Sequence, residues 1–508
     1  MKKNVLQITV LFSAAALLFG CHSDPNENAN KMYVEISQSL QKIQENKGSF
    51  TAEYEAYKQA KIKLNTLLAD YPSSAVAVTL LSGQTKIFGL TLNQFQEKEK
   101  SMKLLADAEQ SPLDAALAIV ETIDKTSYHI SPLLTEIAIT YAEAGDKETA
   151  NSLTSRSIET AKSINDSDEK ANVLTEIANE YAESGQKDQA ESLLSESLTI
   201  VNNANLDPSR RLGRIAIGYA KIRQCGQADK LSKMIGDIGW MKGIAGECAK
   251  ARQFAHAINI AKAIKVTGAQ AAALTEIGIA YAESGGKREA AQLFFQILEM
   301  IKSIENSGWK AELVAKVADG YAKIEKQGKA ESLLSEAAIA ADTIKGTGNN
   351  FLFAFSGKLA AMAVIYEKNN KKDEAEKMLS KAVDIANTIS NDPNFMKEQA
   401  LLHIVRSWAE AGRSEKVIEI AKTIKEDWWR SQSFFAIIDD IAKKEKFNQS
   451  IALAEQIEDL SWKAKALNNI EKAYIRARKQ PSDADKAILR EIVHSVIEVS
   501  PLFEQATQ

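Results

Sequence analysis

Three positions in the 508-residue chain combine a tryptophan with a basic residue directly after it. A tryptophan face attracts cations, and a neighbouring lysine or arginine binds carboxylates, so such a pair can grip an acidic or aromatic partner. All three pairs stand at one position of an internal repeat, twelve residues before its central residue. We therefore treat them as a candidate partner-binding edge. The pairs are Trp309-Lys310, Trp429-Arg430 and Trp462-Lys463.

A purely structural role for these pairs stays open. Each pair would stand at the start of a helix, where a cation opposes the helix dipole and does not stabilise the helix. The tryptophan could pack the start of the helix, and the cation could pair with a nearby carboxylate. The acidic residues close enough in sequence are Asp168, Glu305, Asp392, Asp427 and Asp459.

No residue pattern indicates catalysis. Asp439 and Asp440 are adjacent acids, but neighbours on a helix point about 100° apart and do not share a site. Four histidines fall in different units without metal-binding spacing. The chain also lacks a phosphate-binding loop and a nucleophile elbow. We expect a non-enzymatic protein without a metal or cofactor. The histidines are His129, His256, His403 and His494.

Composition and charge narrow the class further. The 63 Lys and Arg residues against 67 Asp and Glu give a net charge of −4, which offers no basic surface for nucleic acid. With 45% hydrophobic and 26% charged residues, the chain has the composition of a folded protein rather than a disordered one. Its three cysteines cannot form a disulfide framework. Cys225 and Cys248 fall in successive units, and we expect them to lie too far apart to pair, although an oxidising compartment would permit it.

The N-terminus has the pattern of a secretory signal, with Lys2 and Lys3 followed by an apolar run over 5–19. Its end, Leu18-Phe19-Gly20-Cys21, resembles the lipobox of bacterial lipoproteins, although Phe19 departs from the usual small residue. The resemblance implies cleavage after residue 20 and acylation of Cys21. An uncleaved anchor or an ordinary signal peptide is the alternative. We expect residues 1–20 to be the signal peptide and residues 21–31 to be a flexible tether.

The residue after Cys21 is His22. In enterobacterial lipoproteins an aspartate at that position retains the protein in the inner membrane. Its absence implies an outer-membrane lipoprotein that faces the periplasm, with surface exposure also open.

The rest of the chain repeats one pattern ten times, most visibly in the segments that begin at Thr135, Thr175 and Thr275. Four residues before the central residue stands a large apolar residue, and small residues stand three before and one after it. Offsets of three and four share one face of a helix, so each unit begins with a helix that neighbours can approach closely. The central residues are Tyr141, Tyr181, Tyr219, Cys248, Tyr281, Tyr321, Tyr366, Trp408, Ile441 and Tyr474.

Later positions of the unit predict a turn and a second helix. Gly145, Gly185, Gly285 and Gly412 stand four residues after the central residue, where a left-handed residue ends a helix. An alanine five residues further on begins a second apolar-periodic run in seven units. Each unit is therefore predicted to be a pair of antiparallel helices.

This pattern resembles the tetratricopeptide repeat (TPR), whose signature is matched by Ile177, Ala178, Tyr181, Gly185 and Ala190. The central residues of several units are 38 to 45 residues apart. HEAT-type repeats share this longer period but lack the Tyr, Gly and Ala positions. The resemblance implies an all-α superhelical solenoid with a concave surface that holds peptides or proteins. The basic set with which chaperone-binding TPR proteins hold a carboxylate is not evident.

We expect diverged helical repeats over 32–134, TPR-like repeats over 135–480, and a C-terminal capping helix and tail over 481–508. Within these, one helix should end at Pro72, with Ser73 or Ser74 capping the next. Another should contain residues 115–123, and the capping helix should span about 483–499.

Together these patterns predict an interaction scaffold that is lipid-anchored in the bacterial envelope and presents a groove to an envelope protein or peptide. The alternative is a lipoprotein that binds a glycan or peptide ligand through the Trp and basic edge. The sequence does not identify the partner, the pathway or the oligomeric state.

Overall fold

The computed structural model describes residues 24–41, 50–123, 130–203, 208–304, 307–342, 349–390 and 395–497. Within these ranges the regular structure is helical, with no β-strand beyond a single isolated bridge, which confirms the predicted all-α class. The predicted signal peptide, Cys21 and the C-terminal tail lie outside the described residues. The chain forms two compact units, residues 1–106 and 107–508.

The first unit consists of α1 (Pro25–Gln41), α2 (Phe50–Asp70), α3 (Ala75–Leu81) and most of α4 (Leu92–Ala108). α1 packs against α2 and α3 through a small apolar core that includes Ile36, Leu64 and Leu80. The predicted helix before Pro72 is α2. Ser74 caps α3 as predicted, since its hydroxyl accepts the N–H of Ala77.

The predicted tether over 21–31 is wrong from residue 25 onward, because α1 begins at Pro25. The carboxylate of Asp24 accepts the N–H of Asn26 at 2.9 Å, and Glu27 places a negative charge in the first turn. Proline suits the first helical position because its missing N–H would have no partner there. Residues 25–31, which were expected to be polar spacer, therefore belong to a helix instead.

The second unit starts at Asp107 rather than at the predicted residue 135, so α5 (Pro112–Thr122) belongs with the repeats. Its helix pairs follow the predicted pattern, each first helix being joined to a second by a short turn. The pairs are α6 (Ile130–Ala144) with α7 (Lys147–Ser163), α8 (Ser167–Glu183) with α9 (Lys187–Asn203), α10 (Pro208–Lys221) with α11 (Cys225–Ser232), α12 (Ile238–Lys250) with α13 (Phe254–Ala263), α14 (Thr267–Glu283) with α15 (Lys287–Lys302), α16 (Ser307–Lys323) with α17 (Gln327–Asp342), α18 (Asn349–Lys368) with α19 (Lys372–Thr388), α20 (Met396–Glu410) with η1 (Ser414–Val417) and α21 (Ile418–Lys422), and α22 (Asp427–Lys443) with α23 (Phe447–Glu455).

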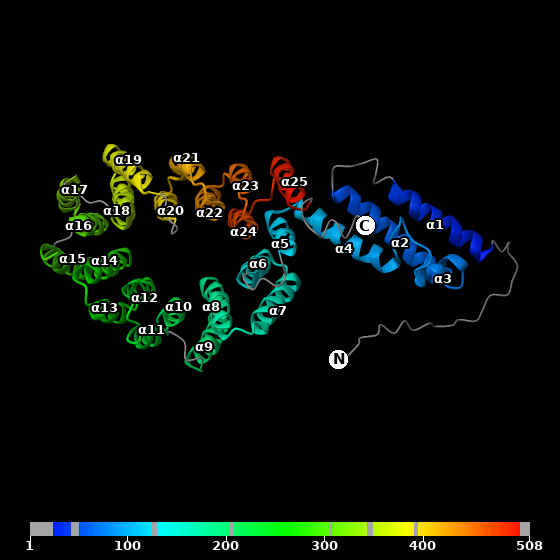
Figure 1. The fold of residues 1–508 in the computed structure, drawn as a ribbon, viewed down its shortest axis with the longest axis horizontal. Helices are drawn as coiled ribbons and strands as arrows, with labels where there is room; N and C mark the ends of the chain where they lie inside the picture. The colour runs from blue at the N-terminus through cyan, green and yellow to red at the C-terminus, as the bar shows by residue number, and fades with distance from the viewer. Residues whose placement is uncertain are drawn as a thin grey trace. The chain divides into compact units, whose positions relative to one another are not determined.

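Two further helices, α24 (Leu460–Ala477) and α25 (Asp483–Ile497), end the described chain. The first helices, α6 to α24 in even numbers, form an inner layer, and the second helices lie outside them (Figure 1). The predicted large apolar residue of each inner helix is in the core, as at Ile177 and Ile277, which are fully buried. The fold is thus a TPR-like solenoid of antiparallel helix pairs.

The turn of every repeat contains a left-handed residue four positions after the central residue. The four predicted glycines occupy this position with φ between 74° and 96°. The other six units have non-glycine residues at this position, and these residues adopt the same left-handed conformation. In each unit the N–H of the residue directly after the left-handed residue donates to the carbonyl of the central residue, as from Gln186 to Tyr181 at 2.8 Å. This hydrogen bond ends the helix. The six residues are Arg223, Arg252, Glu325, Asn370, Glu445 and Arg478.

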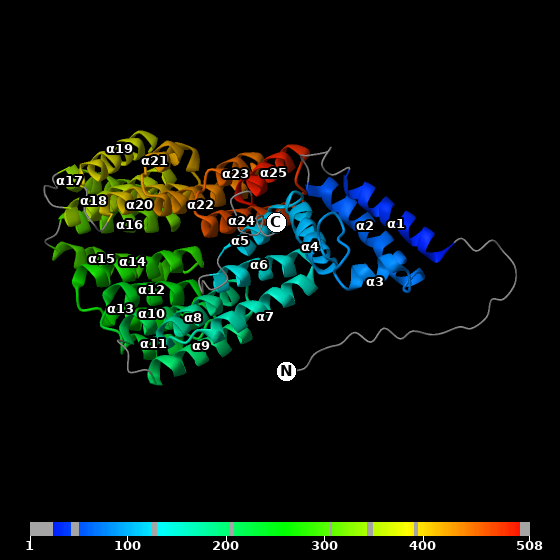
Figure 2. The same ribbon diagram turned by 45° about the vertical axis from the view of Figure 1, so that its right-hand side comes forward.

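The inner layer closes on itself, which the sequence did not predict. Each inner helix packs against the next from α6 to α24, and α24 packs against α6. α24 also packs against α5 as extensively as inner helices pack against their own outer partners, so α5 takes the outer position beside it. The predicted capping helix is α25, and it packs against both α23 and α5 (Figures 1 and 2). The second unit is therefore a closed ring rather than an open groove.

Cys225 and Cys248 form a disulfide, which corrects the expectation that they lie too far apart. Their Cα atoms are 5.7 Å apart, within the usual range. The turn before α11 is short, and Cys225 is the first residue of that outer helix. It therefore meets the C-terminal part of the next inner helix, α12, where Cys248 is buried.

Candidate functional site

Ion pairs join neighbouring inner helices at successive positions around the ring. Glu283 on α14 pairs with Lys323 on α16 at 2.8 Å, and Glu136 on α6 pairs with Lys472 on α24 at 3.1 Å. These charges largely neutralise one another. Further pairs are Glu176–Arg214 at 2.6 Å, Glu183–Lys221 at 2.5 Å and Glu312–Lys358 at 2.5 Å.

Glu312 is the most strongly held of these carboxylates. Burial by itself would raise its pKa, but the ammonium groups of Lys316 and Lys358 outweigh that effect and lower the pKa to about 2. Lys316 lies 3.0 Å from the carboxylate and Lys358 lies on the next inner helix. Glu312 therefore stays ionised at any physiological pH and fixes α16 against α18.

Trp309, from the candidate partner-binding edge, packs at the start of α16 against Gly268 on α14. A Cβ at Gly268 would lie 1.9 Å from the Trp309 ring, so only glycine fits there. The Nζ of Lys358 lies 5.1 Å from the ring centre, as in a cation–π contact. Lys310 is half-buried. This pair is on α16, whereas the other two pairs are on α22 and α24.

Arg430 makes several bonds within the chain. Its guanidinium donates to the carbonyls of Ile424 at 3.1 Å and Lys425 at 2.9 Å. It also pairs with Asp427, one of the acidic partners proposed from the sequence, and with Glu458 at 2.9 Å. Arg430 thus ties the loop after α21 to the starts of α22 and α24.

Lys463 is only 7% exposed. Burial lowers its pKa, although Glu455 and Glu458 oppose the change. Its neighbour Trp462 is half-buried and packs against Phe435 of α22, with ring centres 5.2 Å apart. Arg430 therefore makes structural contacts and Lys463 is buried, whereas Trp429 and Trp462 belong to one aromatic cluster.

Trp429 and Trp462 meet in an aromatic cluster that also contains Trp428 and Phe435. The rings of Trp428 and Trp429 meet edge to face at 4.4 Å, and Trp428 reaches Trp462 at 6.4 Å. Trp428 is 49% exposed and is the most accessible member. Trp428 is not among the residues predicted from the sequence, although the doublet Trp428-Trp429 was a usable signal. Adjacent helical residues point in different directions, so only one of the two can pack inward.

A cavity of about 700 Å³ opens beside the cluster, between α20 and α22. Phe435 and Trp462 line one part of it, and the acids Asp439 and Glu410 line another. Asp439 pairs with Lys443 at 2.6 Å. An aromatic wall with a few polar groups is the usual lining of a site that binds a ligand or a partner side chain.

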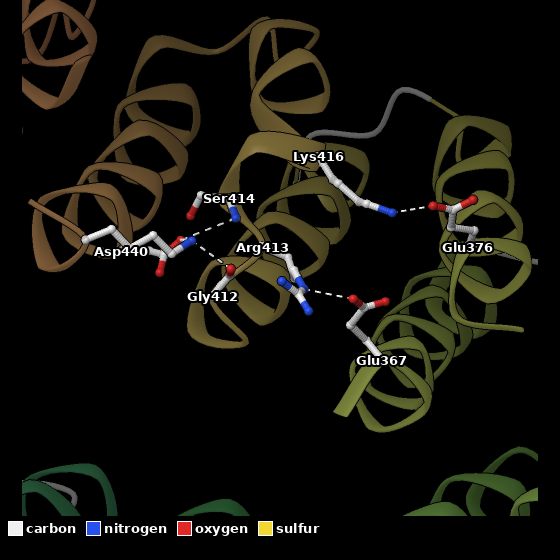
Figure 3. Close-up of polar contacts among 8 residues, drawn as sticks. Glu367, Glu376, Gly412, Arg413, Ser414, Lys416 and Asp440 are labelled. Carbon is white, nitrogen blue, oxygen red and sulfur yellow. Dashed lines mark hydrogen bonds and ion pairs between the residues drawn. The ribbon is translucent and has the colours of Figure 1, made fainter. Parts of the chain in front are cut away.

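The rim of the cavity at Gly412 is held by the contacts in Figure 3. The N–H of Ser414 donates to the carboxylate of Asp440 at 3.3 Å, and Lys444 donates to the Gly412 carbonyl at 2.7 Å. Arg413 pairs with Glu367 on α18 at 2.8 Å. Lys416 pairs similarly with Glu376 on α19. The irregular second helix of this repeat is thus fixed on both sides, and the cavity has a rigid edge.

Neither metal binding nor membrane spanning is evident in the described part of the chain. No three histidine, cysteine or acidic side chains there are grouped so that they could hold a metal ion. None of the helices within the same ranges has the length and apolar content to cross a bilayer.

No protein-family model matches the chain, and no curated protein matches it. Among solved structures, it is similar to Ton1535 from Thermococcus onnurineus NA1 at 19% identity, over 63% of this chain and 96% of that one, with a TM-score of 0.21. The apo form of the quorum sensor NprR from B. thuringiensis is 12% identical over 86% of this chain and 99% of that one, with a TM-score of 0.24. A circular tandem repeat protein with novel repeat topology is 12% identical over 95% and 99%, with a TM-score of 0.16. The assignment to the TPR-like solenoids rests on the helix pairs themselves.

Proposed function

We propose that this protein is a non-enzymatic scaffold of the bacterial cell envelope that binds a protein or peptide partner at the aromatic cluster of α22 and α24. The observation that carries the proposal is the half-exposed Trp428 in edge-to-face contact with Trp429 and Trp462, beside a cavity of about 700 Å³. Tryptophans that are partly exposed at the edge of a pocket dominate the binding energy of many interfaces. A rigid ring supports such a surface because its helices are fixed on both sides.

Anchoring by an acyl group on Cys21 at the periplasmic face of the outer membrane is part of the same proposal. It rests on the lipobox-like segment that ends at Cys21. The disulfide between Cys225 and Cys248 supports an extracytoplasmic location, because such bonds persist in oxidising compartments. Because Cys225 and Cys248 are bonded to each other, acylation of Cys21 would not compete with that disulfide.

Capture after crosslinking in cells tests the binding surface. We expect Trp428→Ala to reduce recovery of the partner proteins at least tenfold, the loss typical of a central interface tryptophan. Phe295→Ala is the matched control, because Phe295 is an aromatic residue of α15 that is 63% exposed. Equal recovery with wild type and Trp428→Ala would refute the aromatic cluster as the binding surface.

Membrane fractionation tests the anchor separately. Cys21→Ala should stall processing or release the chain from membranes, because it removes the thiol that would carry the lipid. Normal processing and wild-type fractionation of this variant would show that the chain is not a lipoprotein.

The cavity also favours a second candidate function, the binding of a glycan. Phe435 and Trp462 offer ring faces against a sugar, and the paired Asp439 and Lys443 offer hydrogen bonds without net charge. Glycan-array binding that is lost in Trp462→Ala, without recovery of protein partners, would favour this function over the scaffold.

A further inference from the structure

The first unit exposes a cluster of apolar side chains around α3. Val78 and Leu81 lie one turn apart on this helix and are 53% and 63% exposed. Val34 on α1 is 49% exposed, and Phe88, in the turn after α3, is 38% exposed. We name these four residues the α3 patch.

Two hydrogen bonds hold the parts of the α3 patch together. The side chain of Asn26 accepts the N–H of Ala75, the first residue of α3, at 3.0 Å. Two turns further along α1, the hydroxyl of Tyr33 donates to the carbonyl of Lys86 at 2.6 Å. α3 and the turn that follows therefore run beside the first half of α1, and Val34 is next to the second of these contacts.

Phe88 is held outward by its backbone. Ile87 and Leu90 exchange two hydrogen bonds, of 2.7 Å and 2.9 Å, and close a tight turn. Phe88 occupies that turn with φ of 51°, a conformation that is uncommon for a large side chain. Ile87 is buried while Phe88 is exposed, so the turn separates the two apolar side chains.

The α3 patch lies close to Cys21 along the chain. Cys21 and Asn26 are five positions apart along the chain, which gives a reach of at most roughly 17 Å even when fully extended. Asn26 contacts the start of α3, and Leu81 is about 9 Å further along that helix. An acyl chain on Cys21 would thus bring α3 within a short distance of the bilayer surface.

We propose that the α3 patch contacts the lipid bilayer beside the acyl anchor, an inference that rests on the proposed acylation of Cys21. Apolar side chains at the headgroup boundary add to the binding that acyl chains provide. The exposed charges nearby are Asp24 and Glu27 against Lys31 and Lys86. Because these charges balance, we expect binding that depends on apolar burial and changes little with added salt.

The chain allows a site-specific test, because it offers no competing free thiol once Cys21 is acylated. Cys225 and Cys248 are buried and bonded to each other. An environment-sensitive fluorophore on Leu81→Cys, in the acylated protein bound to phosphatidylethanolamine and phosphatidylglycerol vesicles, should shift its emission to the blue. Nitroxide-labelled lipids should quench it. The matched control is Ile339→Cys on α17, where the native residue is 70% exposed. Identical spectra and quenching at the two positions would overturn the proposal.

A second measurement separates the α3 patch from the anchor. The chain from residue 21 onward, carrying Cys21→Ser, should still partition onto the same vesicles, and Val78→Ser with Leu81→Ser should reduce that partition roughly tenfold. An unchanged melting temperature would show that the exposed substitutions leave the fold intact. No vesicle binding by the Cys21→Ser chain would count against the α3 patch even if mass spectrometry finds Cys21 acylated. If mass spectrometry instead finds Cys21 of the wild-type chain unacylated while the Cys21→Ser chain still binds vesicles, the proposed anchor is refuted and the α3 patch is not.

Discussion

The side-chain amide of Asn468 donates a 3.1 Å hydrogen bond to the carboxylate of Glu136, which lies 332 residues earlier in the chain. Lys472 reaches the same carboxylate from the next turn of α24. Glu136 is only 8% exposed, so this contact is a buried polar link between the two ends of the repeat array. At the outer layer, Arg490 of α25 pairs with the fully buried Glu109 at 3.3 Å. The ring is closed by polar contacts as well as by the packing of α24 against α5.

Reversing the charge of Glu136 should weaken this closure. Glu136→Arg would place a second positive charge against Lys472, and we expect the free energy of unfolding to fall by about 3 kcal/mol, typical of a broken buried ion pair. Adding Lys472→Glu should restore part of the loss. Glu283→Arg is the matched control at a more exposed pair and should cost less than about 1 kcal/mol. Denaturant unfolding would measure all three variants, and equal losses at the two sites would contradict the closed ring.

The left-handed turns give a prediction of increased stability. Arg252 has φ of 61° at the position where four other repeats have glycine. Because a left-handed backbone costs roughly 1 kcal/mol for a residue with a Cβ, Arg252→Gly should stabilise the protein by up to that amount. Gly185→Ala, the reverse change at the equivalent position, should destabilise it by a similar amount. Thermal unfolding that moves in the same direction for both variants would contradict the shared turn conformation.

Stability should decrease as the pH rises toward neutrality, in part because of Glu471 on α24. Burial raises its pKa to about 7, helped by Asp114 and opposed by the N–H of Leu113. In the unfolded chain the carboxyl ionises at its usual lower pKa, so unfolding is favoured progressively between about pH 4.5 and 7 and levels off above that range. This group contributes at most about 3 kcal/mol. Glu471→Gln should remove its share of the decrease, measured as unfolding free energy against pH, and an unchanged profile would contradict the buried position.

Glu180 on α8 should behave in the same way. Burial and the neighbouring Glu136 raise its pKa to about 7, against the opposing Lys465 and Lys472 of α24. Glu180→Gln should therefore stabilise the closed ring most clearly above pH 7. The double variant with Glu471→Gln shows whether the contributions of the two carboxyl groups to stability add.

Loss of the disulfide should lower stability, because the bond restricts the unfolded chain by an amount that depends on the length of the loop it closes. Cys225 and Cys248 are separated by 23 positions, for which the chain-entropy model gives about 3 kcal/mol. Reducing the native protein should lower its melting temperature. The variant with both Cys225→Ala and Cys248→Ala should melt lower with or without reductant. A native protein that melts identically in both conditions would contradict a stabilising bond.

Charge reversal at Arg430 and at Lys310 should change the free energy of unfolding by very different amounts, although the two residues stand at the same repeat position. Arg430→Glu removes two hydrogen bonds to the carbonyls of Ile424 and Lys425 and should cost about 2 kcal/mol. Lys310→Glu, at a half-buried and less constrained site, should cost less than about 0.5 kcal/mol. Partner capture with Lys310→Glu then tests the basic edge without a change of fold, whereas capture with Arg430→Glu would mix binding with stability.

The sequence by itself determined the repeat unit. A helix must bury its apolar face at offsets of three and four, so positions such as Ile177, Ala178 and Tyr181 define the packed face without any knowledge of the neighbours. The turn conformation at Gly185 followed from the same local logic. Both depend only on interactions within a few residues, and the pattern repeats often enough to be unmistakable.

Tertiary structure decided everything that depends on long-range contacts. Closure between Asn468 and Glu136 depends on the small rotation that each repeat adds, and no single unit specifies that sum. The disulfide between Cys225 and Cys248 depends on how closely one outer helix approaches the next inner helix. The exposure of Trp428, beside the buried Lys463, depends on which side chains the neighbouring helices cover. Residue types therefore predicted the repeat and its helices, and packing between helices selected which candidate residues remain accessible for binding.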